Sequence, residues 1–265
     1  MVECKDLLAI GNRGLIMADN FVNGVFLEEC KHRFLCKVDV NGQEELCYIA
    51  SSSKLAHFID LTGREVLLTP NTNKSKTRYT IHAVKTSAGY ILLNLAFVNK
   101  ILQKEFNKSK SIYHEAQNIS AEKTLPGELK VDFLIDGNPT IVVEAKAIIS
   151  GTTIAYVPAM KVKRAVVQLT KLNKLLRMGY SVHYYFVLLS PTLECLQLDK
   201  GNKEFYQEFT KCIENGMRVF VYKTVWKENE VSVMHQPIIE SSFITGIGPS
   251  LRGKNAKRIL LSTPI

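Results

Sequence analysis

The 265-residue chain is 46% hydrophobic and 22% charged, a balance that excludes a disordered or fibrous protein. Its formal net charge of +9 favours an anionic partner such as nucleic acid, although some basic proteins are merely soluble. No apolar run approaches the roughly 20 residues of a membrane span and no secretory signal pattern is visible, so we expect a cytoplasmic protein with no membrane attachment.

The first hundred residues predict short strands separated by turns. Asn41-Gly42 is a hairpin signal between an alternating strand at 34–40 and its return strand at 46–50. Further strands are expected at 65–68, 78–84 and 90–95, whereas Asn23-Gly24 indicates a turn. Short strands with frequent turns favour a small antiparallel β-barrel, for which an OB-like barrel is the natural candidate. The aromatic residues Phe34, Tyr48, Tyr79 and Tyr90 either fill this barrel or offer platforms for bases.

The character of the sequence changes near residue 100, where helical spacing begins at Phe97 and Ile101. We therefore expect a barrel domain over 1–100 and an α/β domain with a central sheet over 101–265. The second domain is predicted to hold a strand hairpin, 131–135 and 140–146, and a helix over 160–178 that Gly179 ends. A buried strand at 182–190, a helix at 205–215 and a strand at 219–222 follow.

The predicted hairpin carries a charged cluster. Asp132 lies inside an apolar strand, where an acid is costly unless it is paired or binds a metal. Glu144 and Lys146 are two residues apart on the return strand and so point to the same face. Asp132 and Glu144 are hard oxygen ligands for Mg²⁺ or Mn²⁺, and Lys146 is placed to position a water or offset charge. The alternative is a cross-strand salt bridge.

The sequence after the cluster is strongly basic. No acidic residue occurs between Ala145 and Leu193. On the predicted helix, Lys161, Arg164, Gln168 and Lys171 form one polar stripe. A cationic helix beside a carboxylate site suits a phosphate backbone, although an ordinary solvated lysine face has the same pattern.

Other polar residues have weaker signals. A third acid would complete a metal site, and spacing alone does not choose among Glu115, Glu122 and Glu128. His183 lies in an apolar strand and fits a hydrogen-bonded core residue better than a ligand. The six cysteines form no metal-ligand pair and are expected to be reduced thiols. The basic stretch 251–265 fits a nucleic-acid-binding tail or a solubilising tail.

These residues resemble the sugar fermentation stimulation protein (SfsA) family. Lys130-Val-Asp-Phe133 is similar to the family's Arg-Ile-Asp-Phe element, and Val143-Glu-Ala-Lys146 to its Glu-Val-Lys element. Tyr156-Val-Pro158 and Arg164 also match positions of its motifs. In the first half, His32-Arg-Phe-Leu35 and Thr62-Gly-Arg64 resemble its barrel segments.

The resemblance implies an N-terminal OB-fold followed by a PD-(D/E)XK nuclease-like mixed-sheet α/β domain. It implies catalytic roles for Asp132, Glu144, Lys146 and Gln168, and a metal site of Asp132, Glu144 and, by position, Glu122. It further implies nucleic-acid-binding roles for Lys130, Lys161, Arg164, Lys171, Arg64 and Arg33. The sequence departs from the family at Lys130, at Ala159 in place of an aspartate, and at Val167-Gln168 in place of a lysine-histidine pair.

Two functions follow from this reading. The first is a DNA-binding protein with a divalent-metal site of nuclease type, which contacts the phosphate backbone without sequence preference. The second is an active Mg²⁺- or Mn²⁺-dependent DNA endonuclease. The intact Asp132, Glu144 and Lys146 favour cleavage, whereas the altered neighbours favour binding alone.

Overall fold

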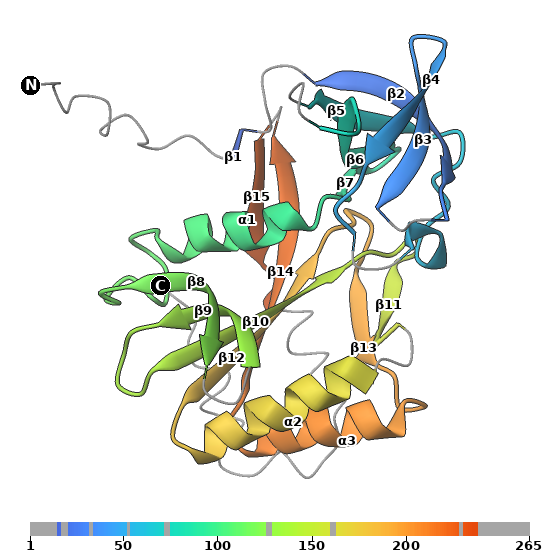
Figure 1. The fold of residues 1–265 in the computed structure, drawn as a ribbon. Coiled ribbons are helices and arrows are strands. Elements are labelled where there is room, and N and C mark those ends of the chain that lie inside the picture. The colour runs from blue at the N-terminus through green and yellow to red at the C-terminus, as the bar shows by residue number, and fades with distance from the viewer. Residues whose placement is uncertain are drawn as a thin grey trace, which may run out of the picture.

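The computed structural model describes residues 15–16, 21–31, 34–51, 54–71, 75–125, 129–159, 163–227 and 230–237. A β-barrel lies at one end of the molecule and a larger α/β body at the other (Figure 1). None of the helices in these ranges has the length and apolar composition needed to cross a membrane.

The barrel closes as an OB-fold does. Its strands are β2 (Val22–Glu29), β3 (Leu35–Val40), β4 (Gln43–Tyr48), β5 (Glu65–Pro70), β6 (Tyr79–Thr86) and β7 (Gly89–Leu92). The ring runs β2, β3, β4, β6, β5 and back to β2, and a parallel pairing between β4 and β6 completes it. This strand order confirms the predicted OB-like barrel.

Two predicted turns in this region have different outcomes. The hairpin turn at Asn41-Gly42 is confirmed, with φ values of 54° and 80° that a mirror-image turn requires. The turn predicted at Asn23-Gly24 is wrong, because both residues lie inside β2. Gly24 is instead a site of close approach: a Cβ atom there would lie 2.6 Å from Cγ1 of Val38. Only glycine lets β2 pass this close to its neighbour.

The α/β body is built on a mixed seven-stranded sheet of order β1-β15-β14-β12-β10-β9-β8. Its strands are β1 (Leu15–Ile16), β8 (Ile119–Leu125), β9 (Leu129–Ile135), β10 (Ile141–Ile148), β12 (Ser181–Leu188), β14 (Arg218–Lys227) and β15 (Glu230–His235). The central strands β10, β12 and β14 are parallel, and β9 and β10 form the predicted antiparallel hairpin. The mixed sheet confirms the predicted fold class.

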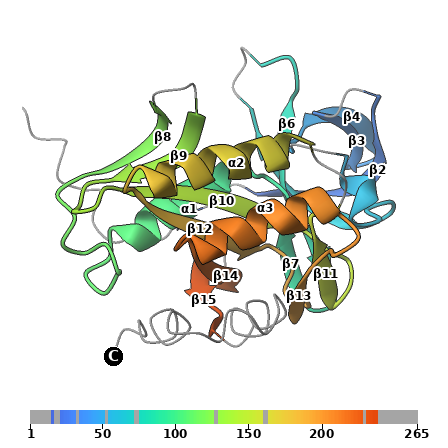
Figure 2. The same cartoon turned by 90° about the horizontal axis from the view of Figure 1, so that it is seen from below.

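Helices cover both faces of this sheet. They are α1 (Ala96–Phe106), α2 (Lys163–Arg177) and α3 (Lys203–Glu214), and a separate pair of short strands comprises β11 (Ile154–Val157) and β13 (Cys195–Leu198). Helices α2 and α3 lie side by side over one face (Figure 2). Helix α1 packs with the opposite face. Gly179 has a φ of 92° and follows the end of α2, as predicted for a helix stop.

The barrel and the body share one hydrophobic core. Buried barrel residues and the α1 face of the sheet form a continuous cluster, and the ring of Tyr90 in β7 lies 5.2 Å from that of Trp226 in β14. Strand β1 pairs with β15, so part of the N-terminal segment belongs to the second sheet. The domain boundary placed at residue 100 stays a prediction, and that residue lies inside α1.

A neutral polar cluster is buried beneath α1. The Tyr113 hydroxyl is hydrogen-bonded to Nδ1 of His183 at 2.6 Å and to the Tyr185 hydroxyl at 2.7 Å. Burial, with a smaller effect of Arg218, lowers the pKa of His183 to about 3. His183 is therefore a neutral, hydrogen-bonded core residue, as the sequence predicted. The five cysteines within the described ranges are unpaired.

Candidate functional site

The parallel pairing of β10 with β12 fixes the face on which the charged cluster lies. Glu144 pairs in register with Tyr184 and Lys146 with Phe186, so both charged side chains share the face that α2 and α3 cover. The Lys146 ammonium donates a hydrogen bond to the Glu144 carboxylate, and a second at 2.9 Å to Oε1 of Gln168 on α2. The structure thus brings together three of the predicted catalytic residues.

Asp132 on β9 completes this cluster. The β9–β10 register, which pairs Phe133 with Val143, continues to set Asp132 opposite Glu144. Its Oδ2 accepts a hydrogen bond from the Ala145 backbone N–H at 2.8 Å, and its Oδ1 accepts one from Nδ2 of Asn99 at 3.0 Å. Asn99 lies on α1 and was not predicted as a site residue. It fixes the orientation of the Asp132 carboxylate.

Glu144 is the most buried member of the cluster, with 3% of its surface exposed. Burial raises its pKa to about 7, and the nearby Asp132 carboxylate adds to this shift, whereas Lys146 and Gln168 oppose it. A carboxyl group with this pKa exchanges its proton near neutral pH. Such perturbed groups gather at functional sites.

The predicted third acid, Glu122, is paired with Lys130 rather than with the charged cluster. Glu122 on β8 lies opposite Asp132 if the β8–β9 register is followed through Ala121 and Lys123. Its side chain is 63% exposed and forms an ion pair of 3.0 Å with Lys130. Glu115 is 90% exposed beside His114, and Glu128 lies outside the described residues. A metal-binding role for Glu122 stays a prediction.

Two carboxylates are nevertheless a donor set that suits a divalent ion. Within the described ranges, no three acidic, histidine or cysteine side chains surround one point. Mg²⁺ in phosphoryl-transfer sites is commonly held by one or two carboxylates, with water and phosphate oxygens in the other positions. Asp132 and Glu144 fit this pattern, since both are oxygen donors that line one cleft.

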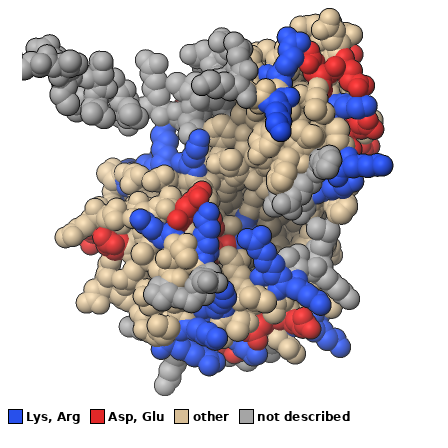
Figure 3. All heavy atoms as spheres, in the orientation of Figure 1, with Lys and Arg blue, Asp and Glu red and all other residues tan. Residues whose placement is uncertain are grey.

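The cluster lies in a cleft of about 750 Å³ between the barrel and the α/β body. On the body side, its lining residues include Lys130, Arg164 and Gln168. On the barrel side they include Leu55, His57 and Phe58. Figure 3, which has the orientation of Figure 1, shows basic side chains gathered on the lower part of the molecule, over α2, with acidic residues among them.

The predicted nucleic-acid-binding residues are spread more widely than this cleft. Lys130 and Arg164 line it. Lys171 lies on α2 beyond the lining residues, and Arg64 lies in the turn before β5. Arg33 and Lys161 lie outside the described residues, as does the basic stretch 251–265.

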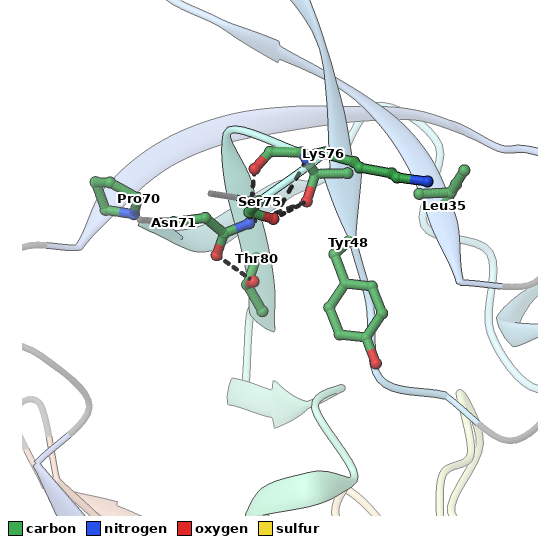
Figure 4. Close-up of a pocket in the computed structure, with 8 residues that line it drawn as sticks. Leu35, Tyr48, Pro70, Asn71, Ser75, Lys76 and Thr80 are labelled. Atoms are coloured by element: carbon green, nitrogen blue, oxygen red, sulfur yellow. Dashed lines mark hydrogen bonds between the residues drawn. The ribbon is translucent and has the colours of Figure 1, made fainter. Parts of the chain in front are cut away.

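The barrel carries a second hollow, of about 510 Å³, between Tyr48 and the segment that joins β5 to β6 (Figure 4). Its polar rim is internally hydrogen-bonded: Asn71 donates to Thr77 and accepts from Thr80. The Tyr48 ring stacks on Phe34, with 6.3 Å between ring centroids. Both of these predicted platform residues are exposed. Since the described lining of the hollow holds no acid, histidine or cysteine, the charged cluster makes the cleft the stronger candidate site.

Comparison with known proteins identifies the family. Residues 96–230 match the model of the sugar fermentation stimulation protein RE domain, a restriction endonuclease-like domain. The chain belongs to the sugar fermentation stimulation protein family. The matched residues run from α1 to β15 and contain every member of the charged cluster.

Relatives within the SfsA family extend the similarity to most of the chain. A sugar fermentation stimulation protein homolog of Saccharolobus solfataricus is 27% identical over 191 residues, which is 72% of this chain and 74% of that protein. A homolog of Desulfitobacterium hafniense is 26% identical over 64% of this chain and 73% of its own length. The solved structure of Pyrococcus furiosus SfsA in complex with Ca²⁺ superposes with a TM-score of 0.69 at 20% identity, over 85% of this chain and 97% of that one. That likeness shows the shared fold.

Proposed function

We propose that this protein binds DNA in the cleft and hydrolyses its phosphodiester bonds with the help of Mg²⁺ or Mn²⁺. The observation that carries the proposal is the convergence of Asp132, Glu144 and Lys146 at the cleft, with Glu144 only 3% exposed. Two carboxylates and an ammonium around one small site match the needs of metal-assisted phosphoryl chemistry.

Asp132 and Glu144 would hold the divalent ion. When bound, such an ion polarises a phosphate oxygen and lowers the pKa of a coordinated water. A relative in the family has been solved with Ca²⁺, which is consistent with an oxygen-rich site for a hard cation. Asn99 and the Ala145 backbone N–H keep the Asp132 carboxylate oriented.

Lys146 supplies positive charge at the site. Its ammonium is shared between Glu144 and Gln168, so Gln168 still holds it when Glu144 takes another partner. A phosphate that enters the cleft gains a charge-assisted hydrogen bond from Lys146, which offsets negative charge as the phosphodiester reacts. Gln168 therefore acts as a positioning residue for Lys146.

Binding is expected to be electrostatic. The net charge is +9, and Lys130 and Arg164 line the cleft that holds the cluster. Contacts to phosphates position a nucleic acid but carry no sequence information. We therefore propose binding without sequence preference, with an affinity that falls as salt rises.

Binding without cleavage is the second candidate function. It is favoured by the direct ion pair between Lys146 and Glu144, which occupies a carboxylate oxygen that a metal would need. Ala159, where the family has an aspartate, removes a further polar group.

One experiment separates the two functions. The purified protein is incubated with single- and double-stranded DNA in Mg²⁺, in Mn²⁺ or in a chelator, beside Asp132→Asn and Lys146→Met. Lys123→Met is the matched control, because Lys123 is an exposed β8 lysine outside the cleft lining. We expect metal-dependent cleavage that both site variants reduce by at least about 100-fold and the control leaves unchanged.

The other outcomes are equally informative. Salt-sensitive binding with no cleavage in either metal would leave the second candidate function. Cleavage in the chelator, or cleavage undiminished in both site variants, would contradict a metal-dependent reaction at this cluster.

A further inference from the structure

The barrel side of the cleft is held in place by hydrogen bonds to its backbone. It includes a short 3₁₀ turn, η1 (Leu55–His57), followed by Phe58. Both oxygens of the Glu29 carboxylate accept backbone hydrogen bonds from this turn, from Leu55 and Ala56, each at 2.8 Å. The Phe58 carbonyl accepts a hydrogen bond of 3.1 Å from the Gly151 N–H, which ties the wall to the loop after β10. The cleft is therefore bounded on two sides by connected backbone.

The size of this space limits what can reach Glu144. A cleft of about 750 Å³ falls in the range of ~300–1,000 Å³ that encloses a single small ligand. A few nucleotides fit such a volume, whereas a duplex is too broad to enter it, because its two backbones are held apart around a major groove about 12 Å wide. Since Glu144 is 3% exposed, a reacting phosphate must enter the cleft rather than rest on its rim.

An apolar strip lines the same cleft. Strand β11 alternates outward Ile154 and Tyr156 with buried Ala155 and Val157. Ile154 is 41% and Tyr156 55% exposed, and both line the cleft along with Phe58. Exposed aromatic and aliphatic side chains offer faces to unstacked bases. In a duplex those base faces are covered by neighbouring base pairs, so the strip favours unpaired nucleotides.

We infer that the cleft takes a single unpaired DNA strand, whose phosphates lie toward Lys146 and Arg164 and whose bases lie toward Tyr156 and Phe58. This inference rests on the function proposed above and names its substrate class. An intact duplex enters only where its strands have separated.

The test compares binding of one fluorescent oligonucleotide as a single strand and as a blunt duplex, in a chelator so that neither is cut. Wild type is measured beside Tyr156→Ala, Tyr156→Phe and Ile154→Ser, with Tyr48→Ala as the control. Tyr48 is also an exposed aromatic residue, but it lines the barrel hollow rather than the cleft. Melting temperatures show that each variant is folded.

We expect tighter binding of the single strand by the wild type. Tyr156→Ala is expected to weaken that binding by about 5- to 150-fold, which corresponds to the ~1–3 kcal/mol of one stacked base. Its effect on the duplex is expected to stay below about twofold, since the base faces of a duplex are covered. Tyr156→Phe keeps the aromatic ring and should bind the single strand as tightly as the wild type. Ile154→Ser should weaken binding of the single strand but not of the duplex. Tyr48→Ala should leave the affinity for both probes unchanged.

Three results would overturn the inference. The first is a duplex bound as tightly as the single strand and weakened equally by Tyr156→Ala. The second is a loss of single-strand binding in Tyr48→Ala but not in Tyr156→Ala, which would move the site to the barrel hollow. The third is the absence of salt-sensitive binding to either probe, and this result also removes the proposed function, whereas the first result leaves it standing.

Discussion

The two faces of the central sheet carry polar clusters of opposite kinds. On the face beneath α2, Glu144 and Lys146 are charged and open into the cleft. On the face beneath α1, Tyr113, His183 and Tyr185 are neutral, at most 4% exposed, and hydrogen-bonded to one another. The clusters arise from two neighbouring strands, since Glu144 and Lys146 lie on β10 whereas His183 and Tyr185 lie on β12, and the register pairs His183 with Val143 and Glu144 with Tyr184.

The two clusters differ in whether their polar groups can still exchange a proton or a partner. Burial keeps His183 neutral, with a pKa lowered to about 3, and its partners are all protein groups. Burial raises the pKa of Glu144 to about 7, and its ammonium partner is held by Gln168 as well. A buried group whose bonds are complete adds stability, whereas a group that can exchange a proton or a partner is suited to chemistry. Substitutions in the charged cluster should therefore lower activity, whereas substitutions in the neutral cluster should lower stability.

The largest expected effect comes from Glu144→Gln. It keeps the shape of the side chain but removes a metal-ligand charge, so we expect DNA cleavage to fall by more than about 100-fold, beyond the 10–100-fold usual for partners of ligands. The melting temperature should change little, because a buried ionisable group gives way to a neutral one. A gel-based cleavage assay and thermal unfolding measure the two effects.

Glu122→Gln tests whether the predicted third acid, which also lines the cleft, belongs to the site. Glu122 is 63% exposed and paired with Lys130, so cleavage should stay within about twofold if it is an ordinary surface ion pair. A loss as large as that of Glu144→Gln would instead make Glu122 the third acid of the site. An unaffected Glu144→Gln would break the contrast between the faces.

Asn99→Leu should have the next largest effect. It removes the 3.0 Å hydrogen bond to Oδ1 of Asp132, and the loss of such a partner typically costs about 10–100-fold in metal affinity or activity. Titration of the protein with Mn²⁺, followed by cleavage or calorimetry, should show that the variant needs a higher Mn²⁺ concentration than the wild type. Excess Mn²⁺ should largely restore its activity. A variant that lost activity at every Mn²⁺ concentration would show that Asn99 does more than orient Asp132.

Tyr113→Phe is expected to act on stability alone. It removes one hydroxyl that serves both His183 and Tyr185, and leaving buried polar groups unpaired costs about 1–3 kcal/mol. Denaturant unfolding measures this loss, and the cleavage rate per folded molecule should be unchanged. Tyr48→Phe is the control, because Tyr48 is 38% exposed and its replacement should cost less than about 0.5 kcal/mol. A fall in cleavage for Tyr113→Phe would show that the two faces are coupled.

The sequence predicted the parts of the site that local periodicity controls. The β9–β10 hairpin and the stripe of α2 follow from residue spacing, and they bring Asp132, Glu144, Lys146 and Gln168 together. The sequence did not predict Asn99, which reaches Asp132 from 33 residues away. Such a contact depends on how α1 docks against the sheet, and no periodic pattern encodes it.

The missed strands have a similar explanation. Strands β11 and β13 have four residues each, too few for an alternation to be recognised. Strand β8 exposes four consecutive residues, 121–124, and so has no apolar face to detect. Its Glu122 matched the family's upstream acid by position, but its ion pair with Lys130 depends on the local backbone, where Glu122 has a φ of 52°.

The last prediction concerns the pH dependence of the neutral cluster. The folded-state pKa of His183 is lowered to about 3, whereas an unfolded histidine titrates near 6.5. Between these values the unfolded chain binds the additional proton, so the stability that neutral His183 gives above pH ~6.5 is lost as the pH falls. The slope that this residue contributes is about 1.4 kcal/mol per pH unit.

His183→Asn keeps a polar group beside Tyr113 without the titration. The free energy of unfolding of wild type minus that of the variant should therefore fall steadily from pH 6 to pH 4, and contributions common to both proteins, including that of Glu144, cancel. A difference that stays flat over this range would mean that His183 takes up a proton in the folded state, and the α1 face would then not be the neutral counterpart of the charged cluster.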